Sequence, residues 1–184
     1  MPSPLPDVDV PALLARLAAR PHRITADSRQ VGRGDAFAAF PGMKADGRRF
    51  IADALARGAG AVLWEPQGFQ WNPDWHVPQL PVEGLQAKLG PIADFIYGSP
   101  SQALWTIGVT GTNGKTSCSR WIAQCLDRCG KRAAVVGTLG NGLCGDEEPA
   151  TLTTPDAALL QEMLARYKKA GALAVAMEVS SHGL

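Results

Sequence analysis

Apolar residues recur along the chain at helical spacing in some segments and in short runs in others, which predicts an α/β fold. In the first hundred residues, apolar spacing indicates helices over 10–20, 49–57 and 85–97, the last of them interrupted at Pro91. Short apolar runs between turn residues predict strands at 24–26, 36–40, 61–64 and 77–82. Such alternation is typical of layered α/β packing.

A second alternation begins after Gly98-Ser99-Pro100-Ser101, the best candidate for a domain boundary. We therefore expect one domain over 1–100 and another over 101–184. The second has predicted strands at 104–110, 133–136 and 172–179, helices at 116–129 and 155–170, and a long glycine-rich connection at 137–151. This order indicates a mainly parallel sheet, which binds ligands at the carboxyl ends of its strands.

Composition and charge narrow the class of protein. The 184 residues are 46% hydrophobic and 19% charged, as in an average globular domain, and the net charge of +1 gives no electrostatic case for a nucleic-acid partner. The first residues lack the basic and apolar regions of a secretory signal, and the longest apolar run is too short for a membrane span. We expect a cytoplasmic protein without a membrane partner.

The cysteine and loop tryptophan residues are interpreted as parts of the packed structure and not as metal or ligand sites. Cys118, Cys125 and Cys129 fall on one stripe of a predicted helix, and together with Cys144 they lack zinc-ligand spacing, so we interpret all four as buried free thiols. Trp71 and Trp75 lie in a predicted surface loop over 67–76. They could form a ligand platform, but packing onto the domain is the favoured interpretation.

The sharpest motif is Thr110-Gly111-Thr112-Asn113-Gly114-Lys115-Thr116, between a predicted strand and a predicted helix. Glycines let successive N–H groups point inward, and a helix N-terminus adds positive potential, so the segment can cradle a polyphosphate. Lys115 would reach the β- and γ-phosphates, and the Thr116 hydroxyl would bind Mg²⁺. The usual pattern has glycine where this chain has Val109; the alternative is a tight turn with an incidental lysine.

Glu178 supports the phosphate-loop interpretation independently. The apolar run over 172–177 predicts a buried strand that delivers this carboxylate to the same sheet edge, where it could hold Mg²⁺ directly or through water. The alternative is a surface glutamate at a strand end. Ser180-Ser181-His182 follows, and we interpret these residues as polar groups at the ligand edge, because sequence neighbours rarely face one another and no oxyanion-hole signature accompanies a hydrolytic Ser–His pair here. The alternative for His182 is a hydrogen-bonded structural histidine.

The chain resembles the Mur ligase family in separated segments that occur in the family's order. They are 27–29, 34–39, 42–47, the phosphate loop, 153–155 and 177–184. The resemblance implies a small nucleotide-sugar-binding N-terminal domain, followed by the first part of a central P-loop domain. It also implies ATP-dependent amide-bond formation in peptidoglycan precursor synthesis, in which a substrate carboxylate forms an acyl phosphate that an amine displaces.

The same resemblance implies the ligands and the residues that contact them. The substrate is UDP-N-acetylmuramoyl dipeptide, which receives meso-diaminopimelate or lysine as its third amino acid, and the cofactors are ATP and Mg²⁺. Residues implied to contact the UDP-muramoyl ligand are Ala26, Ser28, Met43, Lys44 and Ala45, with Thr153, Thr154 and Ser180 at its peptide end. Residues implied to bind ATP are Gly111, Thr112, Asn113, Gly114, Lys115, Thr116 and Ser117, with Lys115 and Glu178 catalytic and Thr116 and Glu178 as metal ligands.

Leu184 falls inside the central domain of this family. We therefore expect the chain to lack the domain that selects the incoming amino acid, to be unable to complete ligation, and to leave its last strand without sheet neighbours. Two alternatives stay open. Another P-loop ligase, such as folylpolyglutamate synthetase, explains the loop but not the segment 27–29, and a non-catalytic binding module would use Trp71 and Trp75 at a partner surface.

Overall fold

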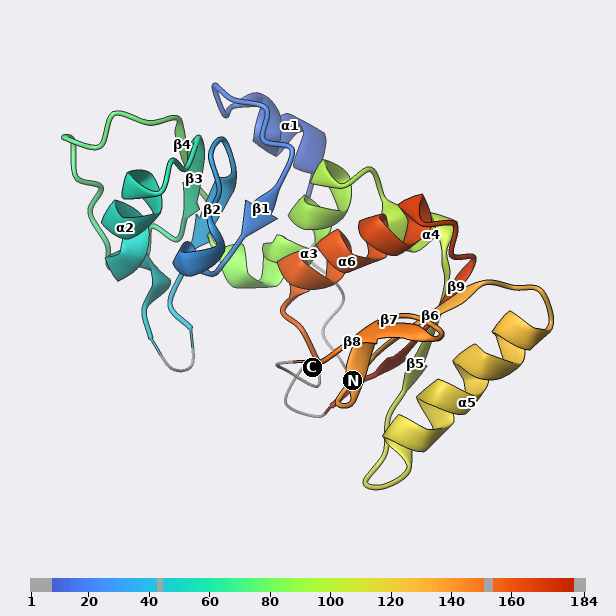
Figure 1. Cartoon of the computed structure of the whole chain (residues 1–184). Helices are drawn as coiled ribbons and strands as arrows, with labels where there is room; N and C mark the ends of the chain where they lie inside the picture. The colour runs from blue at the N-terminus through green and yellow to red at the C-terminus, as the bar shows by residue number, and fades with distance from the viewer. Residues whose placement is uncertain (1–7, 43–44, 151–153, 181–184) are drawn as a thin grey trace. The chain divides into compact units, whose positions relative to one another are not determined.

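The computed structural model describes residues 8–42, 45–150 and 154–180, and the chain forms two compact units, one up to Tyr97 and one from Gly98 (Figure 1). Each unit contains a sheet with helices, so the α/β class is confirmed. The division between the units falls at the start of the segment 98–101. No helix within the described ranges is both long enough and apolar enough to cross a membrane.

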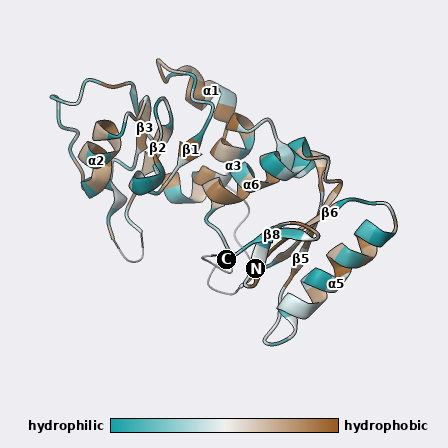
Figure 2. Cartoon of the chain, viewed as in Figure 1, coloured by the Kyte–Doolittle hydropathy of each residue, from teal (hydrophilic) through white to brown (hydrophobic). Residues whose placement is uncertain are grey.

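The first unit has a four-stranded sheet in which every neighbouring pair is parallel. In spatial order its strands are β1 (Ile24–Thr25), β2 (Ala36–Ala39), β3 (Ala61–Trp64) and β4 (Gln79–Pro81). Its helices are α1 (Val10–Ala15), η1 (Ser28–Gln30), η2 (Gly47–Phe50), α2 (Ile51–Ala56) and α3 (Leu85–Ile96). β1, β2 and β3 are predominantly hydrophobic (Figure 2), and Phe37, Ile51 and Leu63 are fully buried.

Two helix predictions in this unit need correction. The first helix ends at Ala15, well before the predicted residue 20. Its apolar spacing stops at Leu17, and Pro21 disfavours a helical conformation just before it. Pro91 does not interrupt α3, because Leu89 before it and Ile92 after it are both buried in the core and hold the helix together across the missing N–H.

The second unit has a five-stranded sheet of mixed direction. In spatial order its strands are β5 (Trp105–Val109), β9 (Ala174–Glu178), β6 (Ala133–Gly137), β7 (Gly140–Leu143) and β8 (Asp146–Glu148). Its helices are α4 (Pro100–Ala103), α5 (Lys115–Arg128) and α6 (Ala157–Lys169). The expectation that the last strand lacks neighbours is wrong, since β9 lies between β5 and β6 and is parallel to both.

The glycine-rich connection over 137–151 contains two strands that the prediction omitted. β7 and β8 form an antiparallel hairpin beside β6. Gly140 and Gly142 approach the β8 backbone so closely that a Cβ at Gly142 would overlap the carbonyl oxygen of Asp146. Glycine contributes no hydrophobic signal, so these strands lack the alternation by which a strand is detected.

Alternate residues of β6 and β9 face opposite sides of the second sheet. On one side, Val135 and Ala176 pack against Ala123 of α5. On the other side, Val136 and Val175 pack in a cluster with Leu164 of α6. Because side chains alternate along a strand, Glu178 belongs to the α5 side with Ala176.

The predicted burial of the cysteines is wrong. Cys118, Cys125 and Cys129 are exposed, and Cys144 is half-buried. Ser119 and Ala123 are the buried residues of α5, so the stripe that faces the sheet is offset from the cysteine stripe. Figure 2 shows the mixed hydropathy of this helix.

The loop tryptophans pack onto the first unit, as the favoured interpretation expected. The Trp71 ring stacks on Trp64 with centroids 5.6 Å apart, and Trp75 meets Trp71 edge-on at 5.0 Å. Trp71 and Trp75 are half-buried against the core cluster that contains Phe37 and Ile51. Their rings therefore serve as an extension of that core.

Candidate functional site

Three parallel strands of the second unit end side by side, and their carboxyl ends define the candidate site. β5 ends at Val109, which pairs with Glu178 at the end of β9. On the other side of β9, Val136 pairs with Met177, so Gly137 at the end of β6 flanks Glu178. The loop that follows β5 therefore starts next to the Glu178 carboxylate.

That loop has the backbone conformation expected of a phosphate cradle. Gly111 and Gly114 have φ values of +142° and +80°, a region that favours glycine. Residues 111–114 are exposed, and Gly114 is the N-cap of the 14-residue helix α5. A glycine N-cap offers no side-chain acceptor, so the first amides of the helix and its positive potential are available to an anion.

Lys115 and Thr116 are the first two residues of α5. The Lys115 Nζ donates a hydrogen bond to the Gly111 carbonyl oxygen at 2.7 Å, which places the positive charge on the loop itself. The buried Ser119 hydroxyl donates to the Thr116 carbonyl oxygen at 3.1 Å and holds the first turn of the helix. The loop thus combines exposed backbone amides with one ammonium group, as the phosphate-loop prediction expects.

Glu178 lies beneath the start of α5 and is 2% exposed, so it is not a surface glutamate. Its Oε2 accepts a hydrogen bond from the Thr116 hydroxyl at 3.0 Å. The two groups predicted as metal ligands are thus in direct contact.

Thr138 and Gly137 belong to the site, and the sequence interpretation missed both. The Thr138 N–H donates to Glu178 Oε1 at 2.8 Å, and its hydroxyl donates to Oε2 at 3.1 Å. A Cβ at Gly137 would overlap the Glu178 carboxylate. The sequence carries one signal for them, a Gly-Thr pair directly after the strand predicted at 133–136. Both residues fall within the predicted glycine-rich connection over 137–151.

Thr154 and Ser180, predicted at the peptide end of the substrate, lie together beside β9. The Ser180 N–H donates to Thr154 Oγ1 at 3.2 Å, and the Thr154 hydroxyl lies 3.3 Å from the Glu178 carbonyl oxygen. Two hydroxyls therefore stand next to the strand end that carries the carboxylate. Thr153 lies outside the described residues.

In the first unit, the residues predicted to contact the UDP-muramoyl ligand come after the first two strands in the sequence. Ala26 comes directly after β1, and Ser28 begins η1, while the exposed Ala45 follows β2. Ser28 lines an open cavity of about 300 Å³ with Arg29, Asp53, Ala56 and Arg57. Met43 and Lys44 lie outside the described residues.

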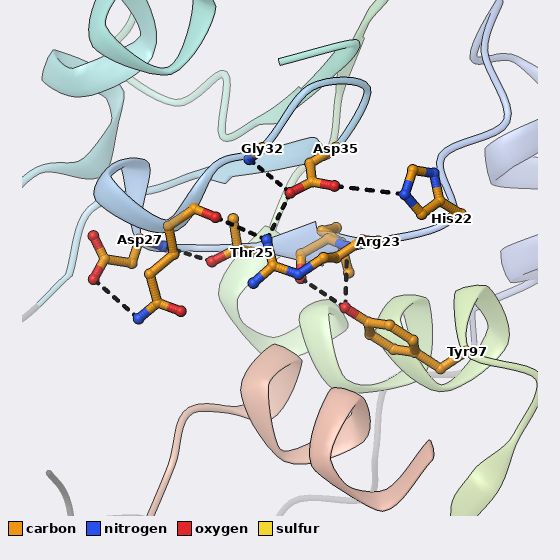
Figure 3. Close-up of polar contacts among 9 residues, drawn as sticks. His22, Arg23, Thr25, Asp27, Gly32, Asp35 and Tyr97 are labelled. Atoms are coloured by element: carbon orange, nitrogen blue, oxygen red, sulfur yellow. Dashed lines mark hydrogen bonds and ion pairs between the residues drawn. The ribbon is translucent and has the colours of Figure 1, made fainter. Parts of the chain in front are cut away.

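An ion pair between the half-buried Arg23 and the buried Asp35 holds the connection between β1 and β2 (Figure 3). Asp35 is 3% exposed, and its Oδ2 accepts from Arg23 Nη1 at 2.6 Å and from the Gly32 N–H at 2.8 Å. Arg23 also donates to the Gln30 carbonyl oxygen at 2.8 Å. These bonds close the loop around η1 and so fix the backbone that carries Ser28.

Arg48 connects the loops that follow β2 and β3. This buried guanidinium donates to both oxygens of Asp46 and to the carbonyl oxygens of Glu65 and Gln67. The hydrogen bond from Arg48 is the main reason why the pKa of Asp46 lies below its ordinary value. In the same way, Arg29 lowers the pKa of Asp27, whose carboxylate caps η1.

Both units match one protein family. The profile of the Mur ligase family, catalytic domain, matches residues 20–97, and that of the Mur ligase middle domain matches residues 109–184. Two similar relatives carry the name UDP-N-acetylmuramoyl-L-alanyl-D-glutamate--2,6-diaminopimelate ligase. The one from Nitrosomonas europaea is 49% identical over 94% of this chain and 33% of its own length, and the one from Chromobacterium violaceum is 50% identical over 98% and 36%.

Solved structures agree with these sequence matches. A structure of UDP-N-acetylmuramoyl-L-alanyl-D-glutamate--2,6-diaminopimelate ligase is 35% identical, with a TM-score of 0.69 over 89% of this chain and 32% of its own. The MurF ligase from Thermotoga maritima in complex with ADP is 26% identical, with a TM-score of 0.59 over 86% of this chain and 32% of its own. The chain spans about a third of the length of the curated relatives that it matches. With family profiles on both units and relatives at about half identity, the chain belongs to the Mur ligase family.

Proposed function

We propose that this chain forms the nucleotide-sugar-binding and ATP-binding parts of an ATP-dependent ligase that makes a carbon–nitrogen bond. The second unit, from about residue 101, would bind ATP and Mg²⁺, and the first would bind the UDP-muramoyl part of UDP-N-acetylmuramoyl-L-alanyl-D-glutamate. The observation that carries the proposal is the buried Glu178 carboxylate in contact with Thr116 at the start of α5. The ADP complex of a related MurF ligase supports it.

The donor set at this position fits magnesium. The Thr116 hydroxyl and the Glu178 carboxylate are hard oxygen donors 3.0 Å apart, and Mg²⁺ in proteins is commonly held by one or two carboxylates together with phosphate oxygens and water. Bound Mg²⁺-ATP would supply the phosphoryl group. Residues 111–117 would orient the phosphates through backbone amides, and the Lys115 ammonium group would neutralise the negative charge that shifts among the phosphate oxygens during transfer.

The remaining predicted residues would place the second substrate. Ala26, Ser28, Met43, Lys44 and Ala45 would contact the UDP-muramoyl part, and Thr153, Thr154 and Ser180 would hold the peptide end, whose carboxylate receives the phosphoryl group. Proximity of this carboxylate to the γ-phosphate accounts for a large share of catalysis in such transfers.

The names of the relatives support diaminopimelate, and not lysine, as the amino acid that the whole protein adds. Ligation itself is proposed for the whole protein, and a cytoplasmic location remains a prediction.

Ligand binding by the 184-residue chain tests the proposal. We expect Mg²⁺-ATP and the UDP-muramoyl dipeptide each to raise the melting temperature. Lys115→Ala should abolish the shift with ATP and keep the shift with the dipeptide, because Lys115 belongs to the phosphate loop only. The matched control is Lys131→Ala, an exposed lysine beyond the end of α5 that should keep both shifts.

Three results would contradict the proposal: no shift with ATP, an ATP shift that survives Lys115→Ala, or stabilisation by folates in place of the muramoyl ligand. The last would favour folylpolyglutamate synthetase chemistry.

A further inference from the structure

The Glu178 carboxylate accepts hydrogen bonds from two described residues, and one of them, Thr138, supplies more than one donor. Thr138 contacts both carboxylate oxygens, Oε1 through its N–H at 2.8 Å and Oε2 through its hydroxyl at 3.1 Å. The remaining side-chain donor that we describe is Thr116, at 3.0 Å from Oε2. Two donors from one residue fix the rotation of the carboxylate plane, which one donor alone would leave free.

The backbone next to Thr138 makes room for this contact. Gly137 ends β6 directly beside Glu178 on the α5 side of the sheet, and any side chain there would overlap the carboxylate. Thr138 itself is exposed, whereas Glu178 is 2% exposed. The threonine thus reaches the buried carboxylate from the exposed turn that follows β6.

Thr116 and Glu178 are both proposed metal ligands, so orienting the Glu178 carboxylate calls for a donor that is not itself a metal ligand. Hydrogen bonds from outside the ligand set of a metal commonly provide that orientation. We propose that Thr138 is a positioning residue that keeps Glu178 Oε2 directed at the magnesium site, and that Gly137 is required for it to do so. This inference rests on the proposed binding of Mg²⁺-ATP.

Nucleotide affinity measured at different Mg²⁺ concentrations provides the test. In calorimetric titrations of the 184-residue chain with ADP, Thr138→Val should raise the Mg²⁺ concentration for half-maximal tightening by about 10-fold or more, the usual effect of losing a group that orients a metal ligand. Affinity in EDTA should stay unchanged, because Thr138 is not among the residues proposed to bind phosphate. Thr138→Ser, which keeps the hydroxyl, should restore the wild-type Mg²⁺ dependence.

A matched control is Thr106→Val, which removes the hydroxyl of an exposed threonine on β5; this hydroxyl donates to the Leu104 carbonyl oxygen at 3.4 Å. Melting temperatures of all variants report folding. A further arm combines Thr138→Val with Glu178→Gln. If Thr138 acts through Glu178, its substitution should add little to the loss caused by Glu178→Gln.

The inference is overturned if Thr138→Val leaves the Mg²⁺ dependence unchanged, if affinity in EDTA falls equally, or if the two substitutions have additive effects. Additive effects would mean that Thr138 binds the cation on its own account. Wild-type chain that binds ADP without any Mg²⁺ dependence would instead contradict the proposed function and the inference together.

Discussion

At the scale of single residues, hydrogen-bond donors hold the carboxylates of the proposed binding loops in fixed orientations. Asp35 is held by Arg23 and a backbone amide, Asp46 by Arg48, and Glu178 by Thr116 and Thr138. Removing one partner of such a group leaves the other without compensation, which costs more than the net value of the bond. The proposed binding loops therefore depend on residues that need not touch a ligand.

Asp46 yields a pH prediction. Its pKa in the folded state lies below the ordinary 3.8, chiefly because of the hydrogen bond from Arg48. As pH falls through about 3.8, the unfolded chain takes up this proton first, so acid favours unfolding. The stabilisation is complete above that pH and is lost as pH falls through the folded-state pKa.

We expect Asp46→Asn to lower the free energy of unfolding by about 1 kcal/mol at pH 7, and this difference from wild type should shrink as pH falls below about 3.8. Urea denaturation at several pH values measures it. Asp74→Asn, in an exposed loop, is the control; a difference from wild type that stays constant with pH would refute the role of the Asp46 carboxylate.

At the scale of elements, glycine and proline determine where the sequence pattern misleads. Pro91 stays within α3 because core packing on both sides outweighs one missing hydrogen bond. Gly140 and Gly142 form β7 because the hairpin backbones approach too closely for a side chain. Steric demand and burial, and not local propensity, decide these elements.

Gly142→Ala should therefore destabilise the second unit. The added Cβ meets the carbonyl oxygen of Asp146 on β8, so one of the strands must move, at an expected cost of about 1–3 kcal/mol. Chemical denaturation measures the loss, and hydrogen exchange should locate it in β7 and β8. Leu139→Ala, an exposed residue in the adjoining turn, should change stability by less than about 0.5 kcal/mol. Equal effects of the two substitutions would argue against the close approach.

At the scale of the whole molecule, the two compact units carry different sets of proposed contacts. Ala26, Ser28 and Ala45 lie in the unit up to Tyr97, and the phosphate loop, Thr154, Glu178 and Ser180 lie in the unit from Gly98. Each set follows the carboxyl ends of parallel strands, where α/β sheets bind ligands. Mg²⁺-ATP should therefore act on the second sheet, and the UDP-muramoyl part of the other ligand on the first.

Hydrogen exchange of the chain tests this division. A ligand at about 100 times its Kd stabilises the unit that binds it by about 2.7 kcal/mol. Mg²⁺-ATP should slow exchange in β5, α5 and β9 and leave β1 to β4 unchanged, whereas the UDP-muramoyl dipeptide should slow exchange around η1. Equal protection of both sheets by ATP would contradict separate sites.

Much of this architecture is determined by the sequence itself. Apolar runs bounded by turn residues mark the strands on both sides of the phosphate loop, because burial requires a period of two in strands and of about 3.6 in helices. The Gly-Lys-Thr segment between a strand and a helix can likewise be recognised in the sequence, because its chemistry is local.

Only the tertiary structure decided the rest. The strand order places β9 between β5 and β6, and it brings Glu178 to Thr116 and Thr138 from 62 and 40 residues away in sequence. The packing of α5 on the sheet leaves the cysteine stripe exposed. These outcomes depend on which surfaces meet, and a pattern along one segment carries no information about its distant partner.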